Sequence, residues 1–195
     1  MILGPSALAL GWLGLWTIAS HGPGLGWISS HIVLLLGIVF LPPAAIGLRR
    51  LLPRPIPKWR NWDLPLLYFG AFTIVIQYLV DLSLGLIARD NVEMGVLFGK
   101  IFAVRVVRIL FYDVGPPCAY LSVMVIAIRH LWAGTRWRAA GLISIGIIVV
   151  AAGRAMNSAV LTLLGHLIML VGFLLAAPPA AIVSLPKSRQ DEARN

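Results

Sequence analysis

Three residues with the chemistry needed for acyl transfer lie in three separate apolar stretches of the sequence. Cys118 is the single cysteine of the chain, and Arg154 and His166 follow it. A cysteine nucleophile needs a neighbouring base that generates the thiolate, and acyl transfer needs a donor for the developing oxyanion. The sequence therefore offers Cys118 as a nucleophile, His166 as its base and Arg154 as the oxyanion donor, provided that the fold brings the three together.

Each of these residues also has a structural interpretation. A lone cysteine in an apolar helix usually packs as a small hydrophobic side chain, and an intramembrane histidine often hydrogen-bonds to a neighbouring helix. A single cysteine excludes an internal disulfide, and no Cys/His spacing indicates a zinc site. We expect no metal and no resident cofactor, and catalytic activity stays an open question at this stage.

Ionisable residues recur in other apolar stretches. They are His31, Asp81, Arg105 and Arg108. On insertion scales, a charged group at the centre of a membrane costs about 2.5–3.5 kcal/mol, so such groups are uncommon unless they are paired or used. The sequence predicts that Asp81 pairs with Arg105 or Arg108, which would attach this basic stretch to the rest of the protein.

The composition indicates an integral membrane protein. Of the 195 residues, 59% are hydrophobic and 12% are charged, which is more apolar surface than one water-soluble core can bury. The formal net charge of +9 comes largely from short basic loops beside apolar stretches. That pattern is typical of cytoplasmic loops and not of a nucleic-acid-binding domain. We expect a multi-pass protein of a bacterial-type inner membrane, in contact with the lipid bilayer and without a nucleic-acid partner.

We predict an all-α, polytopic transmembrane bundle that forms one membrane domain over residues 1–195. Roughly 20 apolar residues are needed to cross the hydrocarbon core as a helix. Six stretches approach or exceed this length, namely residues 2–20, 27–48, 64–87, 114–131, 139–156 and 160–185. The number of spans depends on one further stretch.

That stretch is residues 92–112. Its three cations, Lys100, Arg105 and Arg108, would cost on the order of 8 kcal/mol at the membrane centre, and its apolar side chains would offset a similar amount. If it crosses, the bundle has seven spans and the arginines after the next helix lie outside. If it is an interfacial or re-entrant basic helix, the bundle has six spans and every basic loop is cytoplasmic. The positive-inside pattern favours six spans, with both termini and a tail of residues 186–195 in the cytoplasm.

Helix geometry places several polar side chains at a similar depth. Measured from the outer end of each predicted span at 1.5 Å per residue, the depths are about 3 Å for Arg154, about 6 Å for His31 and Cys118, and about 9 Å for Asp81 and His166. Arg105 and Arg108 lie above or beside them. The sequence therefore predicts a polar site in the outer half of the membrane.

The order of Cys, Arg and His, after a histidine that opens an early span closed by two arginines, resembles the exosortase and archaeosortase family of membrane transpeptidases. The matching pieces are Ser30-His31 with Arg49-Arg50, Pro117-Cys118, Gly153-Arg154 and Gly165-His166. The resemblance implies a protein-sorting peptidase that acts on a membrane-anchored peptide through Cys118, Arg154 and His166. The family's Cys-Ser-Gly triplet is replaced here by Cys118-Ala119-Tyr120, and an asparagine usual shortly before the arginine is missing.

Two non-enzymatic functions are alternatives. In the first, His31 and His166 ligate a b-type haem or a metal ion in a redox subunit, because axial ligation requires imidazoles at similar depth on separate helices. In the second, Arg105, Arg108 and Arg154 line a vestibule for an anionic solute or a lipid headgroup. The protein would then be a small transporter, or an accessory protein that associates with partner membrane subunits.

Overall fold

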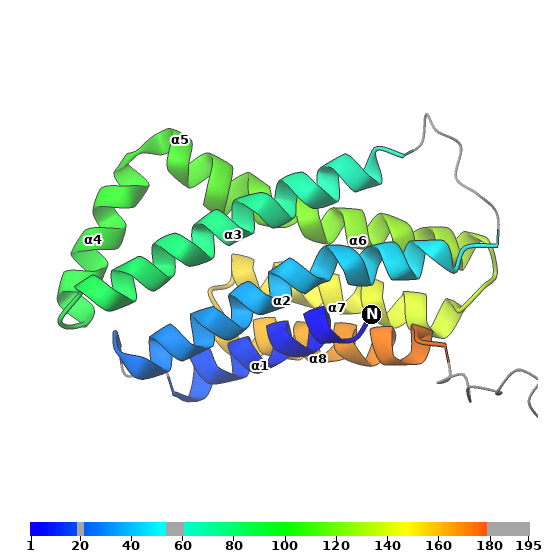
Figure 1. Cartoon of the computed structure of the whole chain (residues 1–195), viewed down its shortest axis with the longest axis horizontal. Coiled ribbons are helices and arrows are strands. Elements are labelled where there is room, and N and C mark those ends of the chain that lie inside the picture. The colour runs from blue at the N-terminus through cyan, green and yellow to red at the C-terminus, as the bar shows by residue number, and fades with distance from the viewer. Residues whose placement is uncertain (19–21, 54–60, 179–195) are drawn as a thin grey trace, which may run out of the picture.

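A computed structural model of the chain describes residues 1–18, 22–53 and 61–178. The described residues form helices joined by turns and contain no strand (Figure 1). In chain order the helices are α1 (Leu3–Thr17), α2 (Leu25–Arg50), α3 (Asp63–Ile87), α4 (Asn91–Ala103), α5 (Arg105–Val107), the π-helix η3 (Arg108–Val114), α6 (Gly115–Trp132), α7 (Trp137–Ala155) and α8 (Ala159–Ala176). The predicted all-α class is confirmed.

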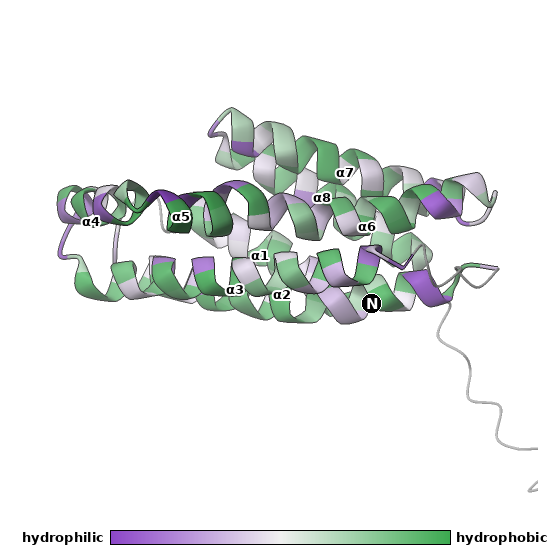
Figure 2. Ribbon diagram, turned by 90° about the horizontal axis from the view of Figure 1, so that it is seen from above, coloured by the Kyte–Doolittle hydropathy of each residue, from purple (hydrophilic) through white to green (hydrophobic). Residues whose placement is uncertain are grey.

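Several of these helices have the length and composition of membrane spans. Five described segments qualify, namely α2, α3, α7, α8 and the continuous run Arg105–Trp132. The first helix, α1, has 15 residues and is shorter than these spans. Many large apolar side chains on the long helices are exposed, among them Phe72, Ile148 and Leu175. Apolar side chains that face outward along a whole bundle are what contact with lipid tails requires. Figure 2 shows that apolar residues predominate along the long helices.

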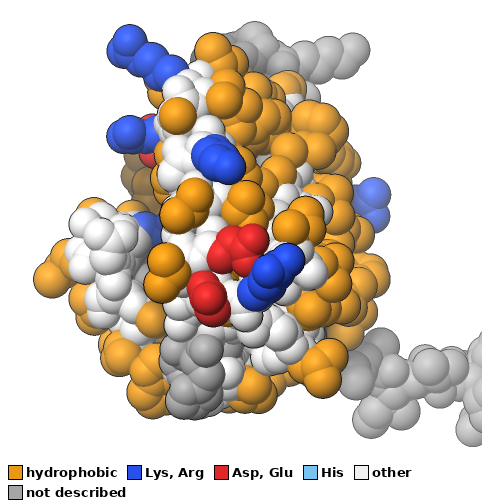
Figure 3. All heavy atoms as spheres, turned by 90° about the vertical axis from the view of Figure 1, so that its left-hand side faces the viewer, with side chains coloured by type: hydrophobic (Ala, Val, Ile, Leu, Met, Phe, Trp, Pro, Cys, Tyr) orange, Lys and Arg blue, Asp and Glu red, His pale blue; other side chains and the backbone are white. Residues whose placement is uncertain are grey.

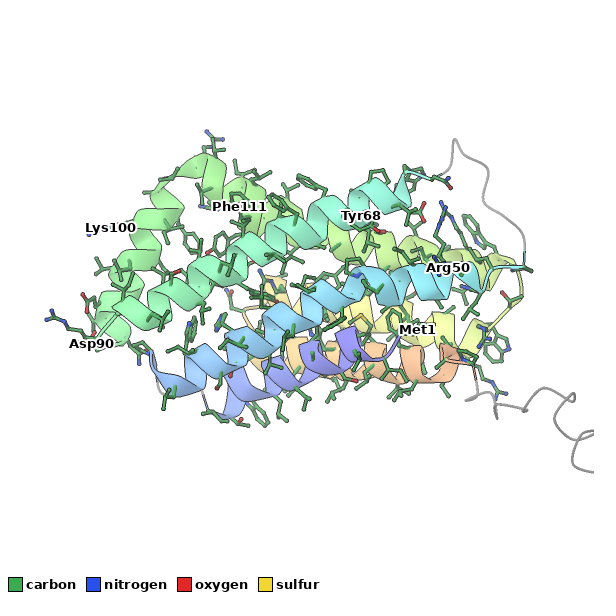
Figure 4. The ribbon with its side chains drawn as sticks, viewed as in Figure 1. Met1, Arg50, Tyr68, Asp90, Lys100 and Phe111 are labelled. Carbon is green, nitrogen blue, oxygen red and sulfur yellow. The ribbon has the colours of Figure 1, made fainter. Side chains whose placement is uncertain are left out.

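The long helices lie side by side, with α4 across one end (Figure 1). We call this end the α4 end. Asp90 and Lys100 lie there, whereas Arg50 lies towards the opposite end (Figure 4). α1 packs along α2, α3 along α6, and α7 along α8. In each of these pairs, side chains from two different helices are therefore brought together.

Glycines allow α7 and α8 to approach each other closely. A Cβ atom on Gly146 would lie 2.6 Å from the Met169 backbone nitrogen, and one on Gly165 would lie 2.5 Å from the Val150 backbone nitrogen. No larger residue fits at either position without moving a backbone. Membrane helices commonly associate through such small residues, since lipid tails provide no hydrophobic force between helices. The residue after Gly165 is His166, so this contact also fixes the position of that imidazole relative to α7.

The stretch of residues 92–112 is divided between two helices. α4 ends at Ala103, and Val104, with ψ of 89°, leaves the helical region. A new helix begins at Arg105 and runs without interruption into α6. The predicted division between residues 112 and 114 does not coincide with a break in the helix, because residues 105–112 belong to the same helical run as Cys118. The chain folds back at Val104, and both ends of α4 stay at the α4 end (Figure 1).

A pair of prolines explains the π-helix within this run. Pro116 and Pro117 have no N–H to donate, and their rings would clash with the carbonyls four residues earlier in a regular α-helix. The turn before them is widened, and the Gly115 N–H bonds to the Leu110 carbonyl, five residues back. A widened turn changes the direction in which the following side chains point. Tyr112, which lies in this turn, reaches across to α3 as described below.

The other predicted spans agree with helices to different extents. α2, α3 and α7 begin and end within two residues of the predicted spans 27–48, 64–87 and 139–156. α8 covers the predicted span 160–185 only as far as Ala176. Residues 179–185, the predicted tail of residues 186–195 and the basic loop 54–60 lie outside the described residues.

Candidate functional site

A cavity of about 650 Å³ lies between α3, α6, α7 and α8. Its inner wall contains buried residues such as Ile74, Tyr78 and His166, and its rim contains the exposed residues Arg154 and Asn157. Arg154 lies in the last turn of α7 and Asn157 comes just after the helix. At this end, α7 diverges from α5 and α6 (Figure 2). We call this space the first cavity. Its lining combines these polar residues with apolar ones.

A second cavity of about 430 Å³ adjoins the first. Aromatic side chains from α1, α2 and α3 form much of its wall, namely Trp12, Trp16, Trp27 and Tyr78. His31 and Asp81 also line it. Trp12, Gln77, Tyr78 and Arg154 line both spaces. A ligand can therefore contact Arg154 from either cavity.

His166 is held in the first cavity by two hydrogen bonds. Its Nδ1 lies 2.7 Å from the Thr162 carbonyl oxygen, one turn earlier on α8. A carbonyl only accepts, so the proton is on Nδ1, and Nε2 accepts from the Tyr120 hydroxyl at 2.9 Å. The Trp12 ring stacks on the imidazole with centroids 5.9 Å apart. His166 is therefore a neutral ring with both nitrogens engaged.

Asp81 lies in a hydrogen-bonded group that we call the Asp81 network. Its Oδ1 accepts from the Tyr112 hydroxyl at 2.8 Å, and its Oδ2 lies 3.8 Å from His31 Nε2. The Trp27 indole donates to the Asp81 backbone carbonyl at 2.8 Å. His31 Nδ1 lies 2.9 Å from the Trp27 carbonyl and donates to it, by the same reasoning as for His166. The network joins α2, α3 and η3.

The predicted partner of Asp81 is wrong. In the described part of the chain, no salt bridge joins Asp81 to Arg105 or Arg108. Arg108 Nε instead lies 3.3 Å from Asp113 Oδ2, in an exposed pair. The break at Val104 and the widened turn of η3 bring Tyr112 to Asp81, and the arginines of this run remain outside the cavities.

Arg154 is the cation of the two cavities. It is exposed at the end of α7 and lines both spaces. Its positive charge interacts electrostatically with Asp81, Tyr120 and His166. Over the residues that the structure describes, it forms no salt bridge with any carboxylate. Its guanidinium donors are therefore available to an anionic group that enters either cavity.

The structure brings together two members of the predicted catalytic trio. Arg154 and His166 line the first cavity, together with Pro117 and Tyr120 of α6. Cys118, half-buried on the same helix, is not part of that lining. Within the described ranges, no hydrogen bond joins Cys118 to His166, whose two ring nitrogens bond to Thr162 and Tyr120. The roles assigned to these three residues in acyl transfer stay a prediction.

The two histidines considered for haem line different cavities. His166 lines the first and His31 the second, with Trp12 and Tyr78 in the wall that both spaces share. The Nε2 atom of His166 faces Tyr120, and that of His31 faces Asp81. This arrangement does not favour one haem held between the two imidazoles.

A second polar group lies at the end opposite α4, and we call Arg49, Asp63 and Arg129 the Asp63 cluster. Asp63 is fully buried, and its Oδ2 lies 3.1 Å from Arg49 Nε and 3.0 Å from Arg129 Nη1. The Ser122 hydroxyl donates to the Asp63 backbone carbonyl at 2.6 Å. The cluster ties α2, α3 and α6 together, so Arg129 contributes to the packing of these helices.

Several residues of the site are absent from the sequence prediction. They are Trp12, Trp16, Gln77, Tyr78, Tyr112 and Tyr120. Gln77 and Tyr78 precede Asp81 by four and three residues, which places them on its face of the helix. Trp12 and Trp16 are likewise one turn apart on α1. Aromatic and amide side chains at helical spacing from an intramembrane carboxylate were therefore a usable signal.

Comparisons with models of protein families, with curated proteins and with solved structures give no match to this chain.

Proposed function

We propose that this protein binds an amphiphilic molecule with an anionic headgroup, in the outer half of a bacterial-type inner membrane. The observation that carries the proposal is the position of Arg154. Its side chain lines two adjoining cavities and, in the described part of the chain, has no salt bridge. A planar guanidinium matches phosphate and carboxylate groups with two parallel hydrogen bonds.

The walls of the first cavity suit an apolar chain beside such a headgroup. Below the Arg154 rim, the lining includes Ile74, Met124, Ile147 and Val150. A volume of about 650 Å³ lies within the range of pockets that hold small molecules, about 300–1,000 Å³. The cavity therefore offers one charged end and one apolar end, as an amphiphile requires.

The hydrogen bonds within the wall limit what the headgroup can contact. The Tyr120 hydroxyl is directed to His166, and the Tyr112 hydroxyl to Asp81. The exposed polar residues that line the first cavity are Arg154, Asn157 and Asp113, and the Asp113 carboxylate is paired with Arg108. A single anionic group, such as a phosphate, accepts hydrogen bonds from Arg154 and Asn157 without breaking these internal bonds.

The topology that this function needs has six spans. We propose that α1 forms a short sixth crossing beside α2, and that α4 is the interfacial helix on the outer side. Both ends of α4 lie at one end of the bundle, where charged side chains are surrounded by apolar ones (Figure 3). Arg49 and Arg50 lie at the last turn of α2, at the opposite end. The positive-inside rule then makes that end, and both termini, cytoplasmic.

This topology has a direct test in protein lacking Cys118. A cysteine that replaces Asn91, at the start of α4, should react with a membrane-impermeant maleimide in intact cells. A cysteine that replaces Thr135, between α6 and α7, should react only after the membrane is permeabilised. The opposite pattern would reverse the orientation and move the cavities to the inner leaflet.

The activity that we propose is binding, as part of transport or as an accessory subunit, and not peptide cleavage. The reason is that Arg154 faces the cavities while Cys118 lies outside their lining. A small transporter would pass the amphiphile between leaflets. An accessory protein would hold it for partner subunits in the same membrane.

Binding of dihexanoyl phosphatidylglycerol to the purified protein tests the proposal. Arg154→Gln should weaken binding about 10- to 100-fold, because a hydrogen bond to a charged group contributes about 1.5–3 kcal/mol. Arg138→Gln is the matched control, since Arg138 is a cation of α7 at the opposite end, next to Trp137. Equal affinity of Arg154→Gln and the wild type, or an equal loss in Arg138→Gln, would refute the proposal.

A further inference from the structure

We infer that the second cavity takes an organic ammonium group, so that the ligand is zwitterionic, with its anion at Arg154 and its ammonium among the tryptophans. This inference rests on the proposed function and names the class of its ligand. The ligand class is an ammonium-bearing phosphodiester, such as the headgroup of a choline or ethanolamine phospholipid.

The first argument is the aromatic wall. Trp12, Trp16, Trp27 and Tyr78 come from three helices and line one space. Aromatic faces attract cations through their quadrupole, and walls of several aromatic rings are the usual means of binding quaternary ammonium groups. His31 lies tilted against Trp27 with centroids 4.3 Å apart, and His166 stacks on Trp12 at 5.9 Å. These contacts hold the two indoles in place in the wall.

The second argument is a carboxylate in the same wall. Asp81 lines the second cavity. The Tyr112 hydroxyl donates to its Oδ1, and the Gln77 side chain also forms a hydrogen bond with the carboxylate. An ionised carboxylate has about four acceptor sites, so capacity remains for a further donor or a nearby cation. No lysine or arginine of the described chain forms a salt bridge with it.

The third argument is the contact between Asp81 and His31. Oδ2 of Asp81 lies 3.8 Å from Nε2 of His31, too far for a hydrogen bond. In its neutral form His31 keeps its proton on Nδ1, which donates to the Trp27 carbonyl, and its Nε2 is then an acceptor. Two acceptors therefore face each other at the cavity wall. An ammonium group beside them supplies the positive charge that this pair lacks.

The fourth argument is the relation of the two charges. Arg154 lines both cavities, and Asp81 lines only the second. A purely anionic ligand at Arg154 is repelled by Asp81, and a purely cationic ligand in the second cavity is repelled by Arg154. A zwitterion satisfies both, since each of its charges lies against the opposite one. Its apolar chain then occupies the interior of the first cavity.

Binding measurements with two short-chain lipids and three variants test the inference. Dihexanoyl phosphatidylcholine is the zwitterion and dihexanoyl phosphatidylglycerol the anion. The wild type should bind the choline lipid at least about tenfold more tightly. Asp81→Asn should remove this preference and leave the glycerol lipid as tight or tighter. Arg154→Gln should weaken both lipids.

Trp16→Ala keeps the test independent of any folding defect in Asp81→Asn. Trp16 is 48% exposed, so its loss disturbs little packing. This variant should weaken binding of the choline lipid several-fold more than binding of the glycerol lipid. Trp132→Ala, which removes a 77% exposed tryptophan at the opposite end, is the matched control and should change neither.

Different results separate failure of this inference from failure of the proposed function. If both lipids bind equally and depend on Arg154 but not on Asp81 or Trp16, the ammonium site does not exist while the anion site stands. If Arg154→Gln changes neither lipid, the proposed function fails and the inference fails with it. Free phosphocholine distinguishes the source of the ligand. Affinity equal to that of the choline lipid supports a soluble zwitterion, and much weaker binding supports a membrane lipid.

Discussion

At the end opposite α4, the fully buried Asp63 lies 3.0–3.1 Å from two arginines. At the α4 end, Asp81 contacts a tyrosine hydroxyl and a neutral imidazole, while Arg154 forms no salt bridge in the described part of the chain. The first region has its charges paired within the protein. The second has a carboxylate and a guanidinium that form no salt bridge with a lysine, arginine, aspartate or glutamate among the described residues.

This difference separates two uses of intramembrane charge. A buried ion pair constrains the helices that carry it, and loss of one member leaves an uncompensated charge. A charge at the wall of a cavity costs less to leave unpaired, since water or a ligand headgroup reaches it. The Asp63 cluster therefore holds α2, α3 and α6 in place, and the cavities at the other end are free to bind.

The largest effect is expected for Asp63→Asn, which strands two arginines. Such changes typically destabilise by about 3–5 kcal/mol, so little folded protein should accumulate, as measured by fluorescence-detected size-exclusion chromatography. Asp81→Asn, the matched change at the α4 end, should accumulate near the wild-type level. If the two variants accumulate equally, the distinction between the two ends is wrong.

The next effect concerns the contact that positions His166. Gly165→Ala places a Cβ atom against the backbone of Val150 and should destabilise the protein by about 1–3 kcal/mol, the usual cost of overpacking. A melting curve in detergent would measure it. Gly141→Ala is the control, because a Cβ atom at Gly141 meets no atom within 4 Å. A melting temperature that falls equally in both variants would mean that close packing of α7 and α8 is not the cause.

A smaller effect is expected when the Tyr112 hydroxyl is removed. Tyr112→Phe leaves Asp81 Oδ1 without this donor and should cost about 1–3 kcal/mol, since the carboxylate is mostly buried. The melting temperature should recover in the double variant with Asp81→Asn, whose amide no longer requires the hydroxyl. Tyr68→Phe, at an exposed tyrosine of α3, should show no change. Failure of the double variant to recover would argue against the Tyr112–Asp81 bond.

The smallest effect is expected at Cys118. An acyl-transfer site with His166 as its base predicts fast alkylation of the thiol that slows in His166→Ala. The bonds from His166 to Thr162 and Tyr120 predict instead that the rate changes less than about twofold, because the thiol gains no base from this ring. Rates with a small permeant alkylating agent measure the difference. A marked decrease in the alkylation rate in His166→Ala would support the peptidase hypothesis.

The sequence predicted those features of the fold that depend on residues close together along the chain. Hydropathy alone determined the all-α class and placed α2, α3 and α7 to within two residues of their observed ends. The rise per residue put Arg154 and His166 at a common level, and both line the first cavity. The depth of a residue along a helix axis depends only on its distance in residues from the end of that helix. Errors in predicting the other helices therefore do not change it.

Tertiary structure alone decided which side chains meet at that level. Asp81 bonds to Tyr112 and not to Arg105 or Arg108, because the chain folds back at Val104 and the two prolines widen the turn before α6. Both features change the rotation of a helix about its axis, which hydropathy does not encode. Each side chain's neighbours depend on that rotation and on the helix packed opposite. The sequence therefore predicted that polar groups from different helices lie at a similar depth, and the packing of the helices decided that they line two cavities that share Arg154.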